Sequence, residues 1–161
     1  MSVETPIKPK TKILICERHL PLHDVFKLML GHQYELIFSS DFGQIIPLMG
    51  QYTFRLLIWD LDGVVRPSLQ NDDMETCHTK VLDTLKVIRG AHPELGIVLV
   101  AGEFEYAFQA AVVKQNSSVR FINKPWESTQ FIEKVQVLLG DKKSSIRQWV
   151  LKMPLGRKRE I

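Results

Sequence analysis

Five short apolar runs divide the chain, and each has the length of a buried strand. They contain few charged residues and are rich in Ile, Leu and Val: Lys12–Cys16, Tyr34–Phe38, Arg55–Trp59, Gly96–Ala101 and Val119–Ile122. Strands that are apolar along nearly their whole length are typical of a parallel sheet covered on both faces. The pattern therefore predicts five buried strands.

Stretches with apolar residues three or four positions apart alternate with these strands, as amphipathic helices require. The expected helices are Pro21–Leu30, a short one over residues 42–50, Met74–Arg89, residues 104–112 and residues 131–139. Only the second is weakened by an internal proline, Pro47. Because parallel strands need crossover connections, this alternation predicts an α/β fold, a doubly wound five-stranded parallel sheet with helices on both faces.

Composition supports a single globular domain with short tails. The 161 residues are 45% hydrophobic and 24% charged. No apolar run is long enough to span a membrane, and residues 1–11 lack the apolar core of a signal peptide. Cys16 and Cys77 lie far apart without metal-type spacing. We therefore expect a protein of the reducing cytoplasm.

Charge is distributed unevenly along the chain, whose net charge is +3. Residues 141–161 carry seven Lys or Arg and two acids, so that residues 12–140 are mildly acidic. We expect a flexible N-terminus over residues 1–11, a domain over 12–140 and a basic tail or linker over 141–161. Contact of this tail with nucleic acid or an anionic membrane is only thinly supported by its few basic residues.

Charged residues stand where three of the expected strands end. Glu17 follows the first strand, Asp60 follows the apolar run of the third, and Lys124 follows the fifth. Because ligands of open parallel sheets bind at the carboxyl ends of the strands, we expect these three side chains to meet. Two acids and a lysine at one place would hold a divalent cation and a phosphoryl group.

Residues 12–140 resemble the receiver domain of response regulators, the CheY-like family. Asp60 matches the family's phosphoacceptor, Lys124 its phosphoryl-binding lysine before a proline, and Glu17 one member of its acidic pair. Phe121 matches the switch aromatic on the fifth strand. The resemblance implies a flavodoxin-like strand order of 2-1-3-4-5.

The resemblance also implies a function, two-component phosphorelay signal transduction. Asp60 would accept a phosphoryl group from a histidine kinase or phosphotransfer protein, so that the chain is a phosphoprotein and not an enzyme. Mg²⁺ would be held by Glu17, Asp60 and the backbone carbonyl of Asp62. A downstream protein would bind the face formed by the fourth helix, fifth strand and fifth helix, and a homodimer stays open.

Several positions depart from the family pattern. Arg18 replaces the second acid, which would weaken metal binding if its side chain lies near the cluster and would remove only one ligand if it points to solvent. Ala101 replaces the Thr or Ser of the switch, so coupling to Phe121 should be weak. The 41 positions from Asp60 to Ala101 are about ten more than is typical, and we place this insertion around residues 63–79. The sequence therefore indicates an atypical or degenerate receiver, which either signals through altered contacts or docks constitutively.

Two other functions stay open. The run Trp59-Asp60-Leu61-Asp62-Gly63 also resembles the first motif of haloacid-dehalogenase-type phosphatases, in which the first Asp is the nucleophile and the second the general acid and base. Against this alternative, the motif stands on the third strand, and no Gly-Asp with a second Asp four positions on follows Lys124. The other alternative is an interaction module that works without phosphorylation.

Overall fold

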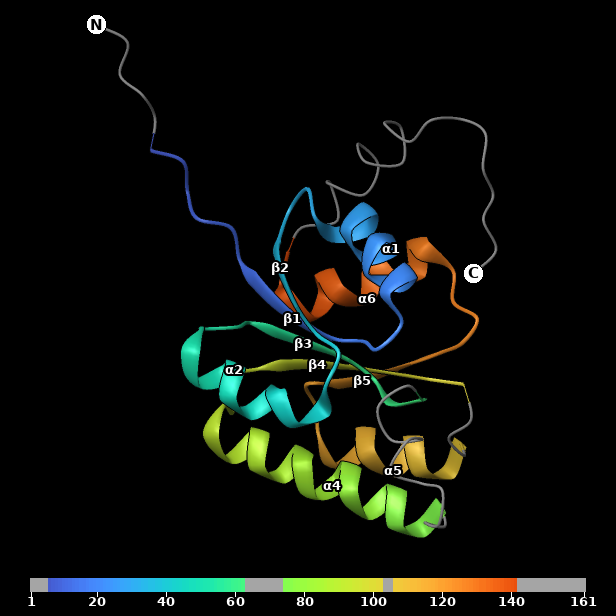
Figure 1. Ribbon diagram of the computed structural model, residues 1–161. Helices are drawn as coiled ribbons and strands as arrows, with labels where there is room; N and C mark the ends of the chain where they lie inside the picture. Colours follow the sequence, from blue (N-terminus) through green and yellow to red (C-terminus); the bar gives the residue numbers. More distant parts are fainter. Residues whose placement is uncertain (1–5, 63–73, 103–105, 142–161) are drawn as a thin grey trace, which may run out of the picture.

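The computed structural model describes residues 6–62, 74–102 and 106–141. Five parallel strands form one sheet in the order β2-β1-β3-β4-β5 (Figure 1). The strands are β1 (Lys12–Cys16), β2 (Glu35–Ser39), β3 (Leu56–Asp60), β4 (Gly96–Ala101) and β5 (Val119–Asn123). The expected doubly wound sheet and its strand order are confirmed.

Helices connect the strands as the alternating pattern predicts. They are α1 (Leu20–Leu30), η1 (Phe42–Gln44), α2 (Ile45–Gln51), α4 (Met74–Ala91), α5 (Tyr106–Gln115) and α6 (Ser128–Leu139). The second helical region begins as a 3₁₀ turn, in which the side chain of Asp41 accepts a hydrogen bond from the N–H of Gly43. Pro47 is accommodated because it lies in the first turn of α2, where its missing N–H has no helical partner.

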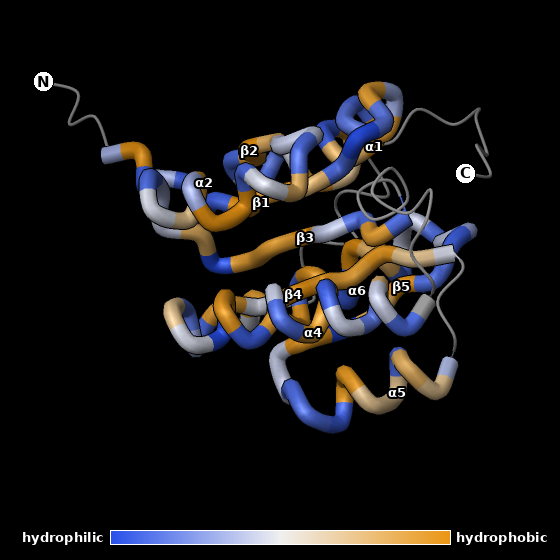
Figure 2. Tube along the Cα trace, turned by 60° about the horizontal axis from the view of Figure 1, so that its bottom comes forward, coloured by the Kyte–Doolittle hydropathy of each residue, from blue (hydrophilic) through white to orange (hydrophobic). Residues whose placement is uncertain are grey.

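The helices cover both faces of the sheet. In Figure 1, α1 and α6 lie above it, and α2, α4 and α5 lie below it. Side chains that alternate along each strand enter two separate cores; on β3, Ile58 packs towards α1 and α6, whereas Leu57 and Trp59 pack towards the other helices. Both faces of each inner strand are therefore apolar, which Figure 2 shows as orange along β3 and β4.

Strand β3 lies between β1 and β4 and is buried along its whole length. Cys16 pairs with Trp59, Asp60 pairs with Val100, and Ala101 pairs with Asn123. This register brings the carboxyl ends of β1, β3, β4 and β5 to one edge of the sheet.

Parts of the expected domain boundaries lie outside the described residues. This applies to residues 1–5 of the N-terminal segment, to 63–73 of the expected insertion and to the basic tail from residue 142 onward. Residues 74–79, which we assigned to the insertion, form the first turns of α4. Among the described helices, none combines the length and apolar character that crossing a membrane would require.

Candidate functional site

Asp60 and Lys124 form an ion pair at the carboxyl edge of the sheet. The Nζ atom of Lys124 lies 2.5 Å from Oδ2 of Asp60, whose side chain is 1% exposed. Lys124 follows β5, and its backbone N–H donates to the carbonyl of Ala101 at the end of β4. The peptide bond between Lys124 and Pro125 is cis. The ends of three neighbouring strands thus fix the position of the lysine relative to the aspartate.

The surrounding charges keep Lys124 in its ammonium form. Burial by itself would lower the pKa of this amine, but the hydrogen bond and the attraction to Asp60 raise it. Asp62 and Glu17 contribute further attraction, and the net effect is a raised pKa. A positive charge therefore stands beside the carboxylate that the sequence indicated as the acceptor.

Glu17 directly follows β1 and is fully buried. Its backbone N–H and its backbone carbonyl each have a partner. Its N–H donates to the carbonyl of Ser39, and its own carbonyl lies 2.6 Å from Nε2 of His23 on α1. In its side chain, Oε1 accepts a hydrogen bond from the N–H of His19 at 2.8 Å. The carboxyl group therefore has a fixed place beneath the start of α1.

The acidity of Glu17 is set by its burial and by the neighbouring carboxyl group of Asp60. Burial, above all, and the Asp60 carboxyl raise the pKa of Glu17 to about 8, against the opposing effects of the His19 N–H and of Lys124. The buried Oε2 of Glu17 accepts no hydrogen bond from any donor among the described residues. Burial therefore favours the protonated form of Glu17 at neutral pH.

Asp62 contributes its side chain to the site, whereas the receiver resemblance implied a role for its backbone carbonyl only. Its N–H donates to Oδ1 of Asp60 at 3.0 Å. Its Oδ2 accepts the N–H of Gly102 at 2.7 Å and lies 3.4 Å from Nζ of Lys124. The pattern of two aspartates on either side of Leu61 at a strand end indicated that Asp62 could take part in the site. Nothing in the sequence indicated that Gly102 would be the partner of its side chain.

The remaining positions that the sequence singles out are Arg18, Ala101 and Phe121. Arg18 is exposed, which agrees with the case in which its side chain turns to solvent. Ala101 is fully buried at the end of β4. Phe121 is buried on β5, where its ring meets that of Phe108 edge-on at 6.3 Å, and Phe108 in turn stacks on His78 at 4.0 Å. Phe121 is thus packed against Phe108 of α5.

The residues present fit a hard, strongly hydrated cation, although they do not form a cage. In the part of the chain that the structure describes, no three His, Cys, Asp or Glu side chains gather as metal ligands. Two carboxylates do meet, and Oε2 of Glu17 is a buried oxygen that lacks a donor. Mg²⁺ usually keeps several waters and needs only one or two protein carboxylates, so Glu17 and Asp60 with a backbone carbonyl suffice.

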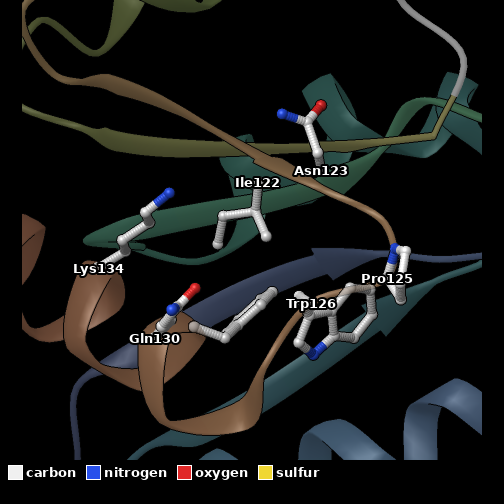
Figure 3. A pocket seen from close by; sticks show the side chains of 7 residues that line it. Ile122, Asn123, Pro125, Trp126, Gln130 and Lys134 are labelled. Carbon is white, nitrogen blue, oxygen red and sulfur yellow. The ribbon is translucent and has the colours of Figure 1, made fainter. Parts of the chain in front are cut away.

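A separate cavity of about 210 Å³ lies between β5 and the start of α6 (Figure 3). Its lining includes Ile122, Asn123, Pro125, Trp126, Gln130 and Lys134. None of Glu17, Asp60 and Lys124 is among the lining residues, so this cavity is distinct from the charged cluster.

Comparison with solved structures decides the fold. A response regulator from Thermotoga maritima superposes with a TM-score of 0.63 at 12% identity, over 82% of this chain and 99% of the other. The signal receiver domain of an HD-domain-containing protein from Pseudomonas fluorescens gives 0.60 at 17% identity, over 95% and 100% of the two chains. The chain has the fold of a response-regulator receiver domain. The Vibrio cholerae chemotaxis protein CheY4 shares this receiver fold, with a TM-score of 0.59 at 14% identity over 80% of this chain and 98% of the other. No protein-family model and no curated protein sequence matches the chain.

Proposed function

We propose that this chain is an atypical receiver domain of two-component signal transduction, which accepts a phosphoryl group at Asp60 from a histidine kinase or phosphotransfer protein. The observation that carries the proposal is the distance of 2.5 Å between Nζ of Lys124 and Oδ2 of Asp60 at the carboxyl edge of the sheet. A carboxylate held beside a fixed cation has both the nucleophile and the charge compensation that phosphoryl transfer needs.

The proposed reaction joins an oxygen of Asp60 to phosphorus. The bond from phosphorus to the imidazole nitrogen of the donor phosphohistidine breaks, and its electron pair stays on the imidazole. Lys124 then lies beside the new acyl phosphate and balances part of its charge. The N–H of Asp62 holds Oδ1 of Asp60 at 3.0 Å, which fixes the orientation of the carboxylate.

Mg²⁺, held by Glu17, Asp60 and the backbone carbonyl of Asp62, would neutralise charge on the transferring group. Because Arg18 is exposed, we infer that its presence in place of an acid removes one metal ligand and does not place a positive charge at the site. Cys16 and Cys77 are buried and form no disulfide, which suits a protein of the reducing cytoplasm.

Signal output would differ from that of a complete receiver. Ala101 has no hydroxyl that a phosphoryl oxygen could draw in, and Phe121 is already packed against Phe108. We therefore propose weak coupling between Asp60 and the face formed by α5, β5 and α6, where a downstream protein would bind. The cavity between β5 and α6 lies on this face.

The test is treatment with acetyl phosphate and Mg²⁺, followed by mass spectrometry of the intact chain. We expect one added phosphoryl group in the wild type and none in Asp60→Asn. Asp83→Asn is the matched control, because Asp83 is an exposed aspartate on α4. No added mass in the wild type, despite Mg²⁺ binding to the folded chain, would leave the interaction module as the better function. Release of phosphate from a generic phosphatase substrate, lost in Asp62→Asn, would instead favour the phosphatase.

A further inference from the structure

We propose that the carboxylate of Asp62 occupies the phosphoryl-binding position of this site and has to be displaced when Asp60 is phosphorylated. This inference rests on the proposed function and gives Asp62 a role in it, as an internal competitor of the phosphoryl group. Asp62 thereby becomes a residue that sets how readily the site accepts an anion.

Two donors converge on one oxygen of Asp62. The N–H of Gly102, at the carboxyl end of β4, donates to Oδ2 at 2.7 Å, and the ammonium of Lys124 lies 3.4 Å from the same atom. A backbone N–H and an ammonium that point at one place beside a nucleophile form an anion-binding position. In this structure the anion at that position is supplied by the chain itself.

Contacts in the same cluster also engage both carboxylate oxygens of the nucleophile, Asp60. Oδ2 of Asp60 is engaged by Lys124 and Oδ1 by the N–H of Asp62, and the side chain is 1% exposed. Both oxygens of Asp60 are therefore engaged while Lys124 bridges the two aspartates, and the carboxylate of Asp62 shares the cation that a phosphoryl group would need. Movement of the Asp62 side chain, which is 19% exposed, would release one of the two acids that hold the lysine.

Gly102 permits this arrangement because it has no side chain. A Cβ atom at this position would lie 3.1 Å from Oδ2 of Asp62 and 3.7 Å from Cβ of Lys124. A larger residue at position 102 would therefore crowd the carboxylate, which would have to shift by a few tenths of an ångström.

Charge favours the phosphoryl group once it is attached. A phosphoryl group carries about −1.5 to −2 charges and three acceptor oxygens, more than the single charge of Asp62. It would take the N–H of Gly102 and the ammonium of Lys124, and it would repel the carboxylate of Asp62. This displacement is a conformational response that needs no hydroxyl at position 101, where the chain has Ala101.

The test compares initial rates of phosphorylation by acetyl phosphate at a fixed Mg²⁺ concentration. We expect Asp62→Ala to react about tenfold faster than the wild type or more, because the competing charge-assisted contacts are gone. Asp62→Asn should be intermediate, since its amide keeps an acceptor but has no charge, and Asp83→Asn should match the wild type. A rate for Asp62→Ala equal to or below the wild-type rate, with the wild type phosphorylated at Asp60, overturns the inference and leaves the proposed function intact.

A binding measurement separates the two claims if no variant is phosphorylated. Inorganic phosphate is titrated into the ¹⁵N-labelled chain, and the amide signal of Gly102 is followed. Binding to Asp62→Ala that is about tenfold tighter than to the wild type would support the competitor role of Asp62 while the phosphoacceptor function fails. Equal affinities, or no phosphate-dependent shift of Gly102 in either protein, would overturn the inference.

Discussion

The carboxyl groups of Glu17 and Asp60 lie at the ends of two adjacent strands, and the Asp60 carboxyl raises the pKa of Glu17. The side chains are 0% and 1% exposed, so bulk water screens their charges little. Two carboxylates in contact cannot both stay charged at low cost, and here the pKa of Glu17 rises to about 8. The protonated form of Glu17 is therefore favoured at neutral pH.

This proton makes stability depend on pH. Glu17 has a higher pKa in the folded chain than its ordinary value of 4.5, so the folded state binds more protons between these two values. The stability that the protonated Glu17 carboxyl contributes to the folded state is complete below about pH 4.5 and is lost as the pH rises through about 8. We expect Glu17→Gln, which mimics the protonated acid, to equal the wild type near pH 5. At pH 9 the variant should be more stable, on the order of 2–4 kcal/mol.

Urea unfolding at pH 5, 7 and 9 measures this difference. Glu133→Gln serves as the control, because Glu133 is exposed on α6 and should leave the pH profile of the wild type unchanged. If Glu17→Gln shows the same fall in stability between pH 5 and 9 as the wild type, Glu17 is not the group that holds the proton.

Binding of Mg²⁺ should release this proton. Because the metal needs Glu17 and Asp60 as carboxylates, its apparent affinity should rise between pH 6 and 8, by up to about tenfold per pH unit. Fluorescence of Trp59, the residue before Asp60, reports the binding in a chain that carries Trp126→Phe and Trp149→Phe. Glu17→Gln should bind more weakly and with little dependence on pH, and a steep dependence in this variant would contradict the assignment.

The fold could be predicted from the sequence because each inner strand is apolar on both faces. The run at β4, Gly96–Ala101, had its bounds predicted correctly, since a glycine and a polar segment flank it. Asp60 and Lys124 could be placed together for a related reason, since parallel strands all end at one edge. Helix α2 was harder, because the turn before it is held by a local hydrogen bond from the N–H of Gly43 to the side chain of Asp41, which the apolar pattern does not record.

The details that decide the chemistry of the site could not be predicted. The proton of Glu17 depends on how deeply its carboxyl lies and on its contact with Asp60. The partner of the Asp62 side chain is a backbone N–H 40 positions away, at Gly102. The direction of Arg18 was open as well, because a residue after a strand can turn towards the site or towards solvent with the same sequence.

Removal of the Lys124 charge should destabilise the chain mainly through Asp60. In Lys124→Met the aliphatic stem is kept, but Asp60 becomes a buried acid without its cation. Since Lys124 is 27% exposed and water screens part of the loss, we expect a decrease in stability of about 1–3 kcal/mol. The variant should also lose phosphorylation.

A double-mutant cycle isolates this pair. Asp60→Asn removes the charge that Lys124 balances, so Lys124→Met should cost clearly less in that background, with a coupling of about 1–2 kcal/mol by urea unfolding. Strictly additive effects would show that the ion pair makes no net contribution to the folded state.

Restoring a hydroxyl at the end of β4 should strengthen the link between the site and β5. Ala101 is fully buried at the end of β4, and the receiver resemblance implies that a serine hydroxyl at this position would reach a phosphoryl group on Asp60. A hydrogen bond to a charged group contributes about 1.5–3 kcal/mol, so we expect Ala101→Ser to bind beryllofluoride about tenfold more tightly or better. Ala107→Ser, at an exposed position of α5, should behave as the wild type. The ring signals of Phe121 should shift on beryllofluoride addition more in Ala101→Ser than in the wild type, and equal shifts would show that the missing hydroxyl is not what weakens the coupling.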